Sequence, residues 1–463
     1  MVEQKRLTDW VGDQYEKSGQ HPFNSFEVHQ VVTAARENQP AHDSLLKQIL
    51  HEPNLYEAWK QVKRNHGAPG IDKITLGKFE ENLQGNIEHI ITSVNDGTYK
   101  ACPVRRKDIE KPGGGYRMLG IPIIRDRVLG QAIQQVLTPI LDPCFSEFSF
   151  GFRPGRSAHD AIRYAKSTIA EGYTWVVDID ISKFFDRVNH DILMHLLSKK
   201  LRDKRLLKLI RKFLQAGVMD NGIITRNVDG VPQGSPFSPC LANVLLDVLD
   251  KELEKRGHRF ARYADDCNIY VKSERAAKRV MKSMKQFIET TLKLKLNTEK
   301  SAVDRPWKRK FLGFSFIGGL KTKPRIRIAK KSTKKFKERI RQITKRNRGV
   351  SLKQVVNELN LFLRGWFGYF RLMETPSVLE ELDGWIRHKL RCYILKQWKK
   401  PKKIQKELRK HGAKKPWSVA YSSKGLWRRS LTEQLNFGLD IDYFNELGLF
   451  CLYERWNRYV LSS

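Results

Sequence analysis

The stretch FARYADDCNIYV, residues 260–271, places two acidic residues side by side inside a run that otherwise has the composition of β-strands. Residues 260–263 and 267–271 are both strand-like, which predicts a tight hairpin with Asp265 and Asp266 at or beside its turn. Adjacent carboxylates repel each other, and a buried carboxylate needs a partner or a metal ion. Asp residues also cap turns without any further role, so both interpretations are open at this point.

A second acidic group follows the predicted strand at residues 175–179, within YTWVVDIDISKFFDRVNHDIL. Asp180 stands where this strand ends, but the pattern alone does not choose among Asp178, Asp180 and Asp186. Three converging carboxylates would repel one another unless a divalent cation joined them, and their hard oxygen ligands suit Mg²⁺. Two such ions can activate an attacking hydroxyl and stabilise a leaving oxygen on phosphorus. The acidic residues therefore favour nucleotidyl transfer.

The composition points to a nucleic-acid partner. The 463 residues include 86 Lys or Arg against 50 Asp or Glu, for a formal net charge of +36. Such an excess is typical of a polyanion binder, with a ribosome-associated or merely basic protein as the alternative. The six cysteines have no metal-finger spacing, and no run approaches the roughly 18 apolar residues of a membrane span. We expect a soluble protein of the bacterial cytoplasm or nucleoid, with reduced thiols and no membrane partner.

Strand and helix patterns alternate through the middle of the chain and then give way to basic helices. Residues 100–121 are typical of a hairpin with a glycine turn. Residues 321–348 carry fourteen Lys or Arg and one acidic residue, and they predict a basic amphipathic helix. Further helices are expected from Ser351 and near 385–398. The sequence thus predicts an α/β part before residue 317 and a basic helical part after it.

The string YADD at 263–266 resembles the Y-x-D-D signature of reverse transcriptases. DIDISKFFD at 178–186 is similar to the first catalytic block of that family, in which the metal-binding Asp precedes an aromatic gate residue by five positions. Asp180 and Phe185 fit that spacing, so the resemblance selects Asp180. Three further stretches resemble blocks of the family: GVPQGSPFSPCLANVLLDVLD at 230–250, LNTEKS at 296–301 and FLGF at 311–314.

Other stretches resemble one branch, the group II intron reverse transcriptase and maturase, in its compact class that lacks an HNH endonuclease domain. They are GAPGIDKIT at 67–75, YRMLGIP at 116–122, FGFRPGRSAHDAI at 150–162 and LNLFLRGWFGYF at 359–370. The chain departs from the family where Gly234 is followed by Ser235, because the family usually has two glycines there.

The resemblance implies an α+β fold, the right-hand polymerase, with fingers, a palm built on an antiparallel sheet, a helical thumb and a basic C-terminal tail. The predicted domains are an N-terminal extension of unassigned role at 1–45, fingers and palm at 46–316, a thumb or maturase domain at 317–398 and a basic DNA-binding-like region at 399–463.

The implied activity is that of an RNA-directed DNA polymerase, a nucleotidyltransferase. The resemblance also implies a maturase that binds intron RNA for splicing and for mobility by target-primed reverse transcription. The expected partners are intron RNA, an RNA template, a DNA primer or target and dNTPs, with the oligomeric state left open. Two alternatives remain: a domesticated relative that acts in DNA repair or phage defence, and an RNA-binding splicing factor without polymerase activity.

The resemblance assigns roles to single residues. Two Mg²⁺ ions, with Mn²⁺ as a possible substitute, are held by Asp180, Asp265 and Asp266 and by the main-chain carbonyl of Ile181. Phe185 lies beneath the sugar of the incoming nucleotide, where a 2′-hydroxyl would collide with the ring. The implied dNTP-binding residues are Arg105, Lys111 and Arg117 at the triphosphate, Ile181, Phe185, Gln233 at the sugar and Lys300, which protonates pyrophosphate. The implied RNA-binding residues are Lys334, Lys335, Arg339 and Arg364.

Overall fold

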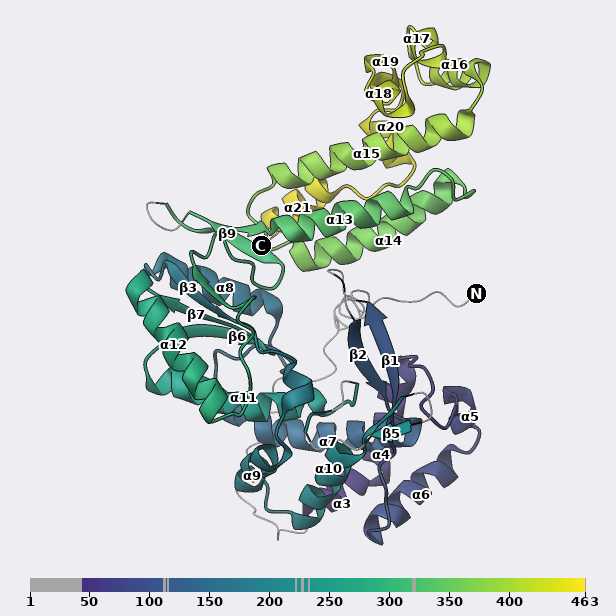
Figure 1. Cartoon of the computed structure of the whole chain (residues 1–463). Coiled ribbons are helices and arrows are strands. Elements are labelled where there is room, and N and C mark those ends of the chain that lie inside the picture. The colour runs from purple at the N-terminus through teal and green to yellow at the C-terminus, as the bar shows by residue number, and fades with distance from the viewer. Residues whose placement is uncertain are drawn as a thin grey trace. The chain divides into compact units, whose positions relative to one another are not determined.

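The computed structural model describes residues 44–110, 114, 116–220, 223–225, 229–231, 234–318 and 322–462. The predicted N-terminal extension, residues 1–45, lies outside the described residues except for its last two. The described chain forms two compact units that divide between Phe311 and Leu312 (Figure 1). Each unit is considered by itself below.

The first unit begins with amphipathic helices that bury their apolar stripes. In α4, Leu55, Trp59 and Val62 recur at helical spacing and are buried together in the main core. The chain is helical from Ser44 to Arg64 apart from an interruption at His51, the N-cap residue of α4, whose side chain makes no capping hydrogen bond. The helices before the first strand are α3 (Ser44–Leu50), α4 (Glu52–Arg64), α5 (Leu76–Glu80) and α6 (Leu83–Asn95).

A four-stranded sheet of order β2-β1-β4-β5 follows. The hairpin predicted at 100–121 is confirmed, since β1 and β2 pair antiparallel from Arg105↔Ile121 to Glu110↔Tyr116. Figure 1 shows this hairpin as a long two-stranded arm above the helices. The elements of this region are β1 (Val104–Glu110), β2 (Tyr116–Ile121), α7 (Ile124–Leu141), η1 (Asp142–Cys144), α9 (His190–Lys200), α10 (Lys204–Gln215), β4 (Val218–Asp220) and β5 (Ile223–Thr225).

The second sheet of this unit is antiparallel, with the order β6-β7-β3-β8. Helix α12 packs against β3 and β7, and α8 and α11 pack against β6 (Figure 1). One hydrophobic core runs from the first helices to this sheet. The elements are α8 (Ala158–Ala170), β3 (Trp175–Ile179), η2 (Phe184–Arg187), α11 (Ser238–Lys255), β6 (Arg259–Tyr263), β7 (Asp266–Val271), α12 (Glu274–Thr290) and β8 (Ala302–Asp304).

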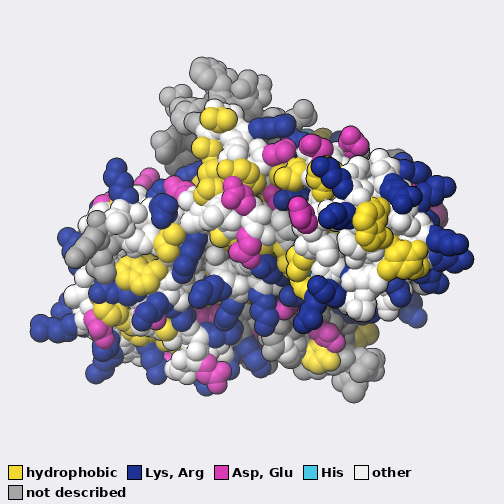
Figure 2. Space-filling model, turned by 90° about the horizontal axis from the view of Figure 1, so that it is seen from above, with side chains coloured by type: hydrophobic (Ala, Val, Ile, Leu, Met, Phe, Trp, Pro, Cys, Tyr) yellow, Lys and Arg dark blue, Asp and Glu magenta, His cyan; other side chains and the backbone are white. Residues whose placement is uncertain are grey.

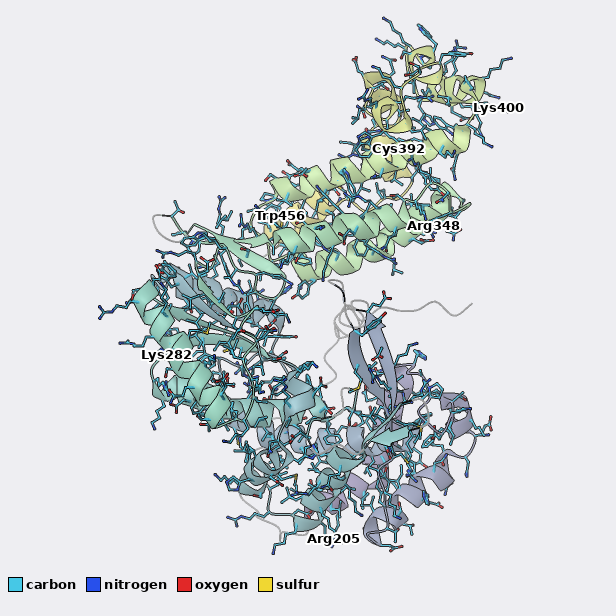
Figure 3. The ribbon with its side chains drawn as sticks, in the orientation of Figure 1. Arg205, Lys282, Arg348, Cys392, Lys400 and Trp456 are labelled. Carbon is cyan, nitrogen blue, oxygen red and sulfur yellow. The ribbon has the colours of Figure 1, made fainter. Side chains whose placement is uncertain are left out.

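The second unit starts with a short hairpin and continues as packed helices around a core of its own. Figure 1 shows α13, α14 and α15 lying side by side, with α21 beside α15. Arg348, after the end of α13, makes two hydrogen bonds of 2.8 Å to Glu358 on α14 (Figure 3). The elements are β9 (Phe314–Ile317), β10 (Arg325–Ile328), α13 (Lys330–Ile343), α14 (Leu352–Phe370), α15 (Ser377–Trp398), α16 (Pro401–Lys410), α17 (Trp417–Ala420), α18 (Leu426–Arg429), α19 (Glu433–Gly438), α20 (Ile441–Glu446) and α21 (Leu452–Leu461).

The C-terminal helix belongs to the core of this second unit. Asp383 on α15 accepts hydrogen bonds from the first main-chain N–H groups of α21, at Leu452 and Tyr453. Trp456 of α21 donates its indole N–H to the carbonyl of Met373 at 2.9 Å (Figure 3). The predicted domain limits at 316/317 and 398/399 stay predictions. The division between the two compact units follows Phe311, and α21 packs against α15 within the second unit.

Lys and Arg side chains crowd the face of the molecule seen in Figure 2, in keeping with the large positive net charge. In the part of the chain that the structure describes, no helix combines the length and the apolar composition needed to cross a bilayer.

Candidate active site

The acidic pair lies at the tip of a two-stranded hairpin. Strands β6 and β7 pair antiparallel up to Tyr263↔Asp266, which leaves Ala264 and Asp265 as a two-residue turn. Ala264 has a φ of 55°, a left-handed conformation that non-glycine residues rarely adopt outside tight turns. The hairpin predicted from the sequence is confirmed.

Strand β3 brings a third carboxylate to the same end of the sheet. The antiparallel register pairs Ile179 of β3 with Cys267 of β7, so Asp180, which follows Ile179, stands beside Asp266, which precedes Cys267. Asp265 follows in the turn. The three acidic residues that the resemblance selects therefore gather at one end of the antiparallel sheet, while their catalytic role stays a prediction.

The two competing acidic residues have different surroundings. Asp178 is engaged by Arg309, whose Nε and Nη2 lie 2.9 and 2.6 Å from its Oδ2. Asp186 is exposed on the short 3₁₀ helix η2. Asp180 has a looser ion pair, with Nζ of Lys300 at 3.4 Å from its Oδ2. These surroundings favour Asp180 over its two neighbours as a metal ligand.

The electrostatics of the hairpin tip disfavour negative charge. Asp266 is exposed, yet its pKa is raised to about 7, first by loss of hydration and then by the carboxylates of Asp265, Asp178 and Asp180, with Lys310 acting in the opposite direction. Within the described ranges, no three His, Cys, Asp or Glu side chains converge closely enough to hold a metal ion by themselves. The described carboxylates thus lie near one another at this end of the sheet, but they do not form a complete set of three metal ligands.

The loop at 297–301 is fixed to the main chain of Asp180. The N–H of Asn297 donates to the Asp180 carbonyl at 2.8 Å, and the N–H of Asp180 donates to Oγ of Ser301 at 3.0 Å. Ile181 is buried and forms an isolated bridge with Leu296. These contacts hold the Lys300 loop against the end of β3.

A buried arginine supports the hairpin turn from below. The side chains of Arg262 and Asp250 are fully buried and form a two-point ion pair, at 2.7 and 2.5 Å. Arg262 Nη1 also donates to Asn243 and to the main-chain carbonyl of Ala264, both at 3.0 Å, and Nη2 donates to Ser149 at 2.8 Å. All five N–H groups of the guanidinium are used, so the turn that carries Asp265 rests on a rigid support.

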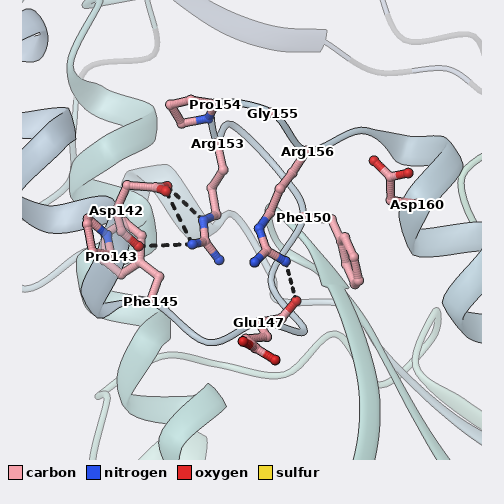
Figure 4. A pocket seen from close by; sticks show the side chains of 10 residues that line it. All are labelled: Asp142, Pro143, Phe145, Glu147, Phe150, Arg153, Pro154, Gly155, Arg156 and Asp160. Carbon is pink, nitrogen blue, oxygen red and sulfur yellow. Dashed lines mark hydrogen bonds and ion pairs between the residues drawn. The ribbon is translucent and has the colours of Figure 1, made fainter. Parts of the chain in front are cut away.

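The loop of the FGFRPGR motif packs against the same turn. A Cβ atom on Gly151 would lie 2.3 Å from the main-chain nitrogen of Ala264, so the close approach requires glycine. Next to this loop is a hollow of about 540 Å³ (Figure 4). Figure 4 shows Arg153 bound to Asp142, while Arg156 donates to the carbonyl of Glu147. Both arginines thus hold the loop in place.

The predicted gate residue Phe185 lies on η2, just after the end of β3. It is half-buried, and its ring meets that of Phe184 nearly edge-on, with centroids 5.1 Å apart. The N–H of Val231 donates to the Phe185 carbonyl at 2.7 Å. Gly230 has a φ of 98°, and a Cβ there would come within 3.0 Å of that carbonyl. The main chain of Phe185 is therefore fixed by the segment that precedes Gln233.

The predicted triphosphate-binding residues are only partly described. Arg105 lies on β1, and its Nε is buried without a hydrogen-bond partner in the structure. Arg117 lies on β2 opposite Ile109, but its side chain is not described. Lys111 and Gln233 lie outside the described residues. The structure therefore leaves their grouping as a prediction.

Two family models match consecutive parts of the chain. "Reverse transcriptase (RNA-dependent DNA polymerase)" matches residues 109–316, and "Group II intron, maturase-specific domain" matches residues 333–412. Protein YkfC of Escherichia coli (strain K12) is 31% identical over 314 residues, which are 59% of this chain and 81% of YkfC. The chain belongs to the group II intron type of reverse transcriptase. The predicted family and the α+β right-hand fold class are confirmed.

Two further similarities cover less of the matched proteins. Group II intron-encoded protein LtrA of Lactococcus lactis subsp. cremoris is 38% identical over 210 residues, which are 45% of this chain and 34% of LtrA. A chain of a solved structure titled "Partial Cas6-RT-Cas1--Cas2 complex" is 28% identical, with a TM-score of 0.35, over 53% of this chain and 42% of its own. The reverse transcriptase described here thus spans about a third of the length of LtrA.

The predicted RNA-binding residues of this reverse transcriptase lie in its second unit. Lys334, Lys335 and Arg339 are exposed on α13, and Arg364 is exposed on α14. The aromatic residues of 359–370 mostly pack inward: Trp366 and Phe370 pack against the core of the second unit, and the Trp366 ring centroid lies 4.4 Å from that of Phe336.

Sequence reasoning missed three features of the reverse transcriptase: the Arg262 support, the Arg309 contact to Asp178 and a cluster of cations around Trp385. In that cluster the charged groups of Lys337, Arg341 and Lys389 lie 5.5 to 5.7 Å from the Trp385 ring centroid. The pKa of Lys389 is lowered, first by burial and then by nearby arginines. The i, i+4 spacing of Lys337 and Arg341 predicts that the two cations lie on one face of α13. The sequence does not show that this face packs against Trp385 of α15.

Proposed function

We propose that this reverse transcriptase is an RNA-directed DNA polymerase in which the 3′-hydroxyl of a primer attacks the α-phosphorus of a dNTP. The observation that carries the proposal is the register of β3 against β7, because it brings Asp180 next to the Asp265 and Asp266 hairpin. The raised pKa of Asp266 supports the same conclusion, since carboxylates crowded at a strand end are costly unless a cation shares them.

Reverse transcriptases generally use divalent metal ions. The donors available here are carboxylate oxygens of Asp180, Asp265 and Asp266 and the main-chain carbonyl of Ile181, and these hard oxygens fit Mg²⁺, with Mn²⁺ as a substitute. Mg²⁺ keeps waters and substrate phosphates among its ligands, so the protein need not supply a complete set. When bound, two ions would stabilise charge on the attacking and leaving oxygens.

The other predicted residues hold the nucleotide. Arg105, with its buried and unpartnered Nε, is suited to a phosphate oxygen, and we assign Lys111 and Arg117 to the same triphosphate. Gln233 donates a hydrogen bond to the sugar. The ammonium of Lys300, which lies 3.4 Å from Asp180, gives a proton to the departing pyrophosphate.

Replacement of Phe185 by Ala tests this site and the polymerase function together. The wild-type chain is expected to extend a DNA primer on an RNA template with dNTPs and to reject rNTPs. Without the ring, a 2′-hydroxyl no longer collides, so the dNTP-to-rNTP ratio of kcat/KM is expected to fall by about 10- to 100-fold. Single-nucleotide incorporation assays measure this ratio.

Phe184→Leu is the matched control, because Phe184 is the neighbouring ring and is buried in the core. It is expected to lower the melting temperature while the nucleotide preference stays near that of the wild type. An unchanged preference in a folded Phe185→Ala variant would contradict the gate assignment.

We further propose that residues 312–463 bind intron RNA and the template duplex, which makes the chain a maturase that supports splicing and target-primed reverse transcription. The exposed cations Lys334, Lys335 and Arg339 on α13 and Arg364 on α14 support this role, because phosphate contacts supply most sequence-independent affinity.

The salt dependence of RNA binding tests this assignment. The logarithm of the wild-type binding constant is expected to fall steeply with the logarithm of the salt concentration. Changing Lys334, Lys335 and Arg339 together to Gln is expected to reduce that slope by about 2 to 3, roughly one for each lost phosphate contact. The matched control changes three exposed cations of α12 to Gln: Arg279, Lys282 and Lys285. Equal slopes in the two triple variants would refute a specific role for α13.

A further inference from the structure

Arg309 connects the strand that carries Asp180 with the loop that carries Lys300. Its Nε and Nη2 both donate to Oδ2 of Asp178, and Nη2 also donates to the main-chain carbonyl of Lys300 at 2.7 Å. Asp178 lies on β3, two residues before Asp180. One guanidinium therefore contacts both segments that meet at Asp180.

The other attachments of this loop to Asp180 lie on either side of Lys300. Asn297 donates its N–H to the Asp180 carbonyl, and Ser301 accepts from the Asp180 N–H. Lys300 lies between these anchors, and the hydrogen bond from Arg309 reaches the carbonyl of Lys300 itself. Arg309 thus holds the main chain of the residue whose ammonium lies 3.4 Å from Oδ2 of Asp180.

Arg309 also occupies a carboxylate that would compete for the ammonium. Residues two apart in a strand point to the same face, so Asp178 and Asp180 share a face of the sheet. With Arg309 in place, Asp178 has a partner that forms two hydrogen bonds to it. Without Arg309, Asp178 would offer Lys300 a second partner one strand step away from Asp180.

We propose that Arg309 is a positioning residue that keeps the Lys300 ammonium beside Asp180, by holding the Lys300 carbonyl and by occupying Asp178. This inference rests on the proposed polymerase function, in which Lys300 gives a proton to the departing pyrophosphate. Arg309 acts through Lys300 and contacts neither the primer nor the nucleotide in this scheme.

A double-mutant cycle between Arg309 and Lys300 tests the proposal, with kcat and KM measured for dNTP incorporation on an RNA template. Lys300→Ala is expected to lower kcat by about 100-fold, the lower end for loss of a general acid. Arg309→Ala is expected to lower kcat by about 10-fold and to leave KM for dNTP within about twofold, because the ammonium is displaced but present. The double variant is expected to be no slower than Lys300→Ala alone.

Arg305→Ala is the matched control. Arg305 ties the same segment to the start of β3, where it donates to the carbonyl and hydroxyl of Thr174 at 3.1 and 2.7 Å. Any loss of kcat that it causes is expected to multiply with the loss caused by Lys300→Ala.

The kcat of Arg309→Lys is expected to stay within about threefold of that of Arg309→Ala, because an ammonium keeps the charge but not the planar fork. If Arg309→Ala does not fold, Arg309→Lys takes its place in the double-mutant cycle.

Several outcomes would overturn the inference. One is a double variant whose loss of kcat equals the product of the losses of the two single variants. Another is a Lys300→Ala variant with the kcat of wild type while Arg309→Ala is slow. A fall in melting temperature well beyond that of Arg305→Ala would assign Arg309 a structural role, since partly exposed ion pairs contribute little stability. A wild-type chain that does not extend the primer would refute the proposed function as well, whereas multiplicative losses on an active wild type would refute this inference alone.

Discussion

Primer extension on an RNA template is expected to fall by at least about 1000-fold when Asp265 and Asp266 are both changed to Ala, since electrostatic groups aimed at the reacting phosphate carry much of the rate in phosphoryl transfer. The hairpin tip would then lack two of the three carboxylates that gather beside the end of β3. Asp180→Ala is expected to have an effect of the same size. Extension of a labelled primer in Mg²⁺, followed over several hours, measures the loss.

Two controls separate this effect from misfolding. Asp186→Ala removes an exposed carboxylate from the neighbouring η2 helix and is expected to leave extension within about threefold of wild type, as for most surface substitutions. The double variant is expected to bind RNA normally and to melt no lower than wild type above pH 7 without divalent cations. The reason is the raised pKa of Asp266, which means that the ionised carboxylate destabilises the folded chain at such pH. Extension by the folded double variant at a rate near that of wild type would refute the site.

The hairpin and its acidic pair could be predicted from the sequence because their signals are local. Strand periodicity and turn composition place Asp265 and Asp266 at a tip without knowledge of the rest of the fold. The choice of Asp180 over Asp178 has no such local signal, because residues two apart share one face of a strand. The distinguishing contact comes from Arg309, 131 residues further along the chain. Only the resemblance to a known family could make that choice in advance.

The helical unit shows the same division between local and distant signals. The helix expected from Ser351 by its apolar spacing is confirmed, and Ser351 is its N-cap residue. The basic helix predicted over 321–348 is confirmed only for 330–343, because Arg325–Ile328 forms strand β10, which pairs with β9. The expected start of the next helix near residue 385 was wrong, since α15 begins at Ser377. That helix is buried on several sides by α21, α16 and α18, so its apolar residues do not form a single stripe. The return of α21 to α15 depends on the Asp383 cap, which is also a distant contact.

The largest stability effect is expected at Arg262. Changing Arg262 to Ala leaves Asp250 as a fully buried carboxylate without its partner, which costs about 3–5 kcal/mol. The Ala264 carbonyl loses a donor at the same time, so the turn that carries Asp265 loses its support. We expect a strongly lowered midpoint of urea unfolding and, at a temperature where the variant remains folded, extension reduced by about 100-fold, as for a misplaced catalytic group. Urea unfolding and primer extension on the same preparation measure both effects.

A paired replacement separates the two roles of Arg262. Exchanging a buried ion pair for apolar residues of similar volume is often neutral for stability, so Arg262→Met combined with Asp250→Leu is expected to regain most of the unfolding free energy. It cannot restore the hydrogen bond to Ala264, because a Met side chain has no N–H to donate. Extension by the paired variant should therefore remain about as low as in Arg262→Ala despite the recovered stability. Full recovery of extension together with stability would show that the ion pair only holds the fold, and that the turn with its acidic pair keeps its geometry without the guanidinium.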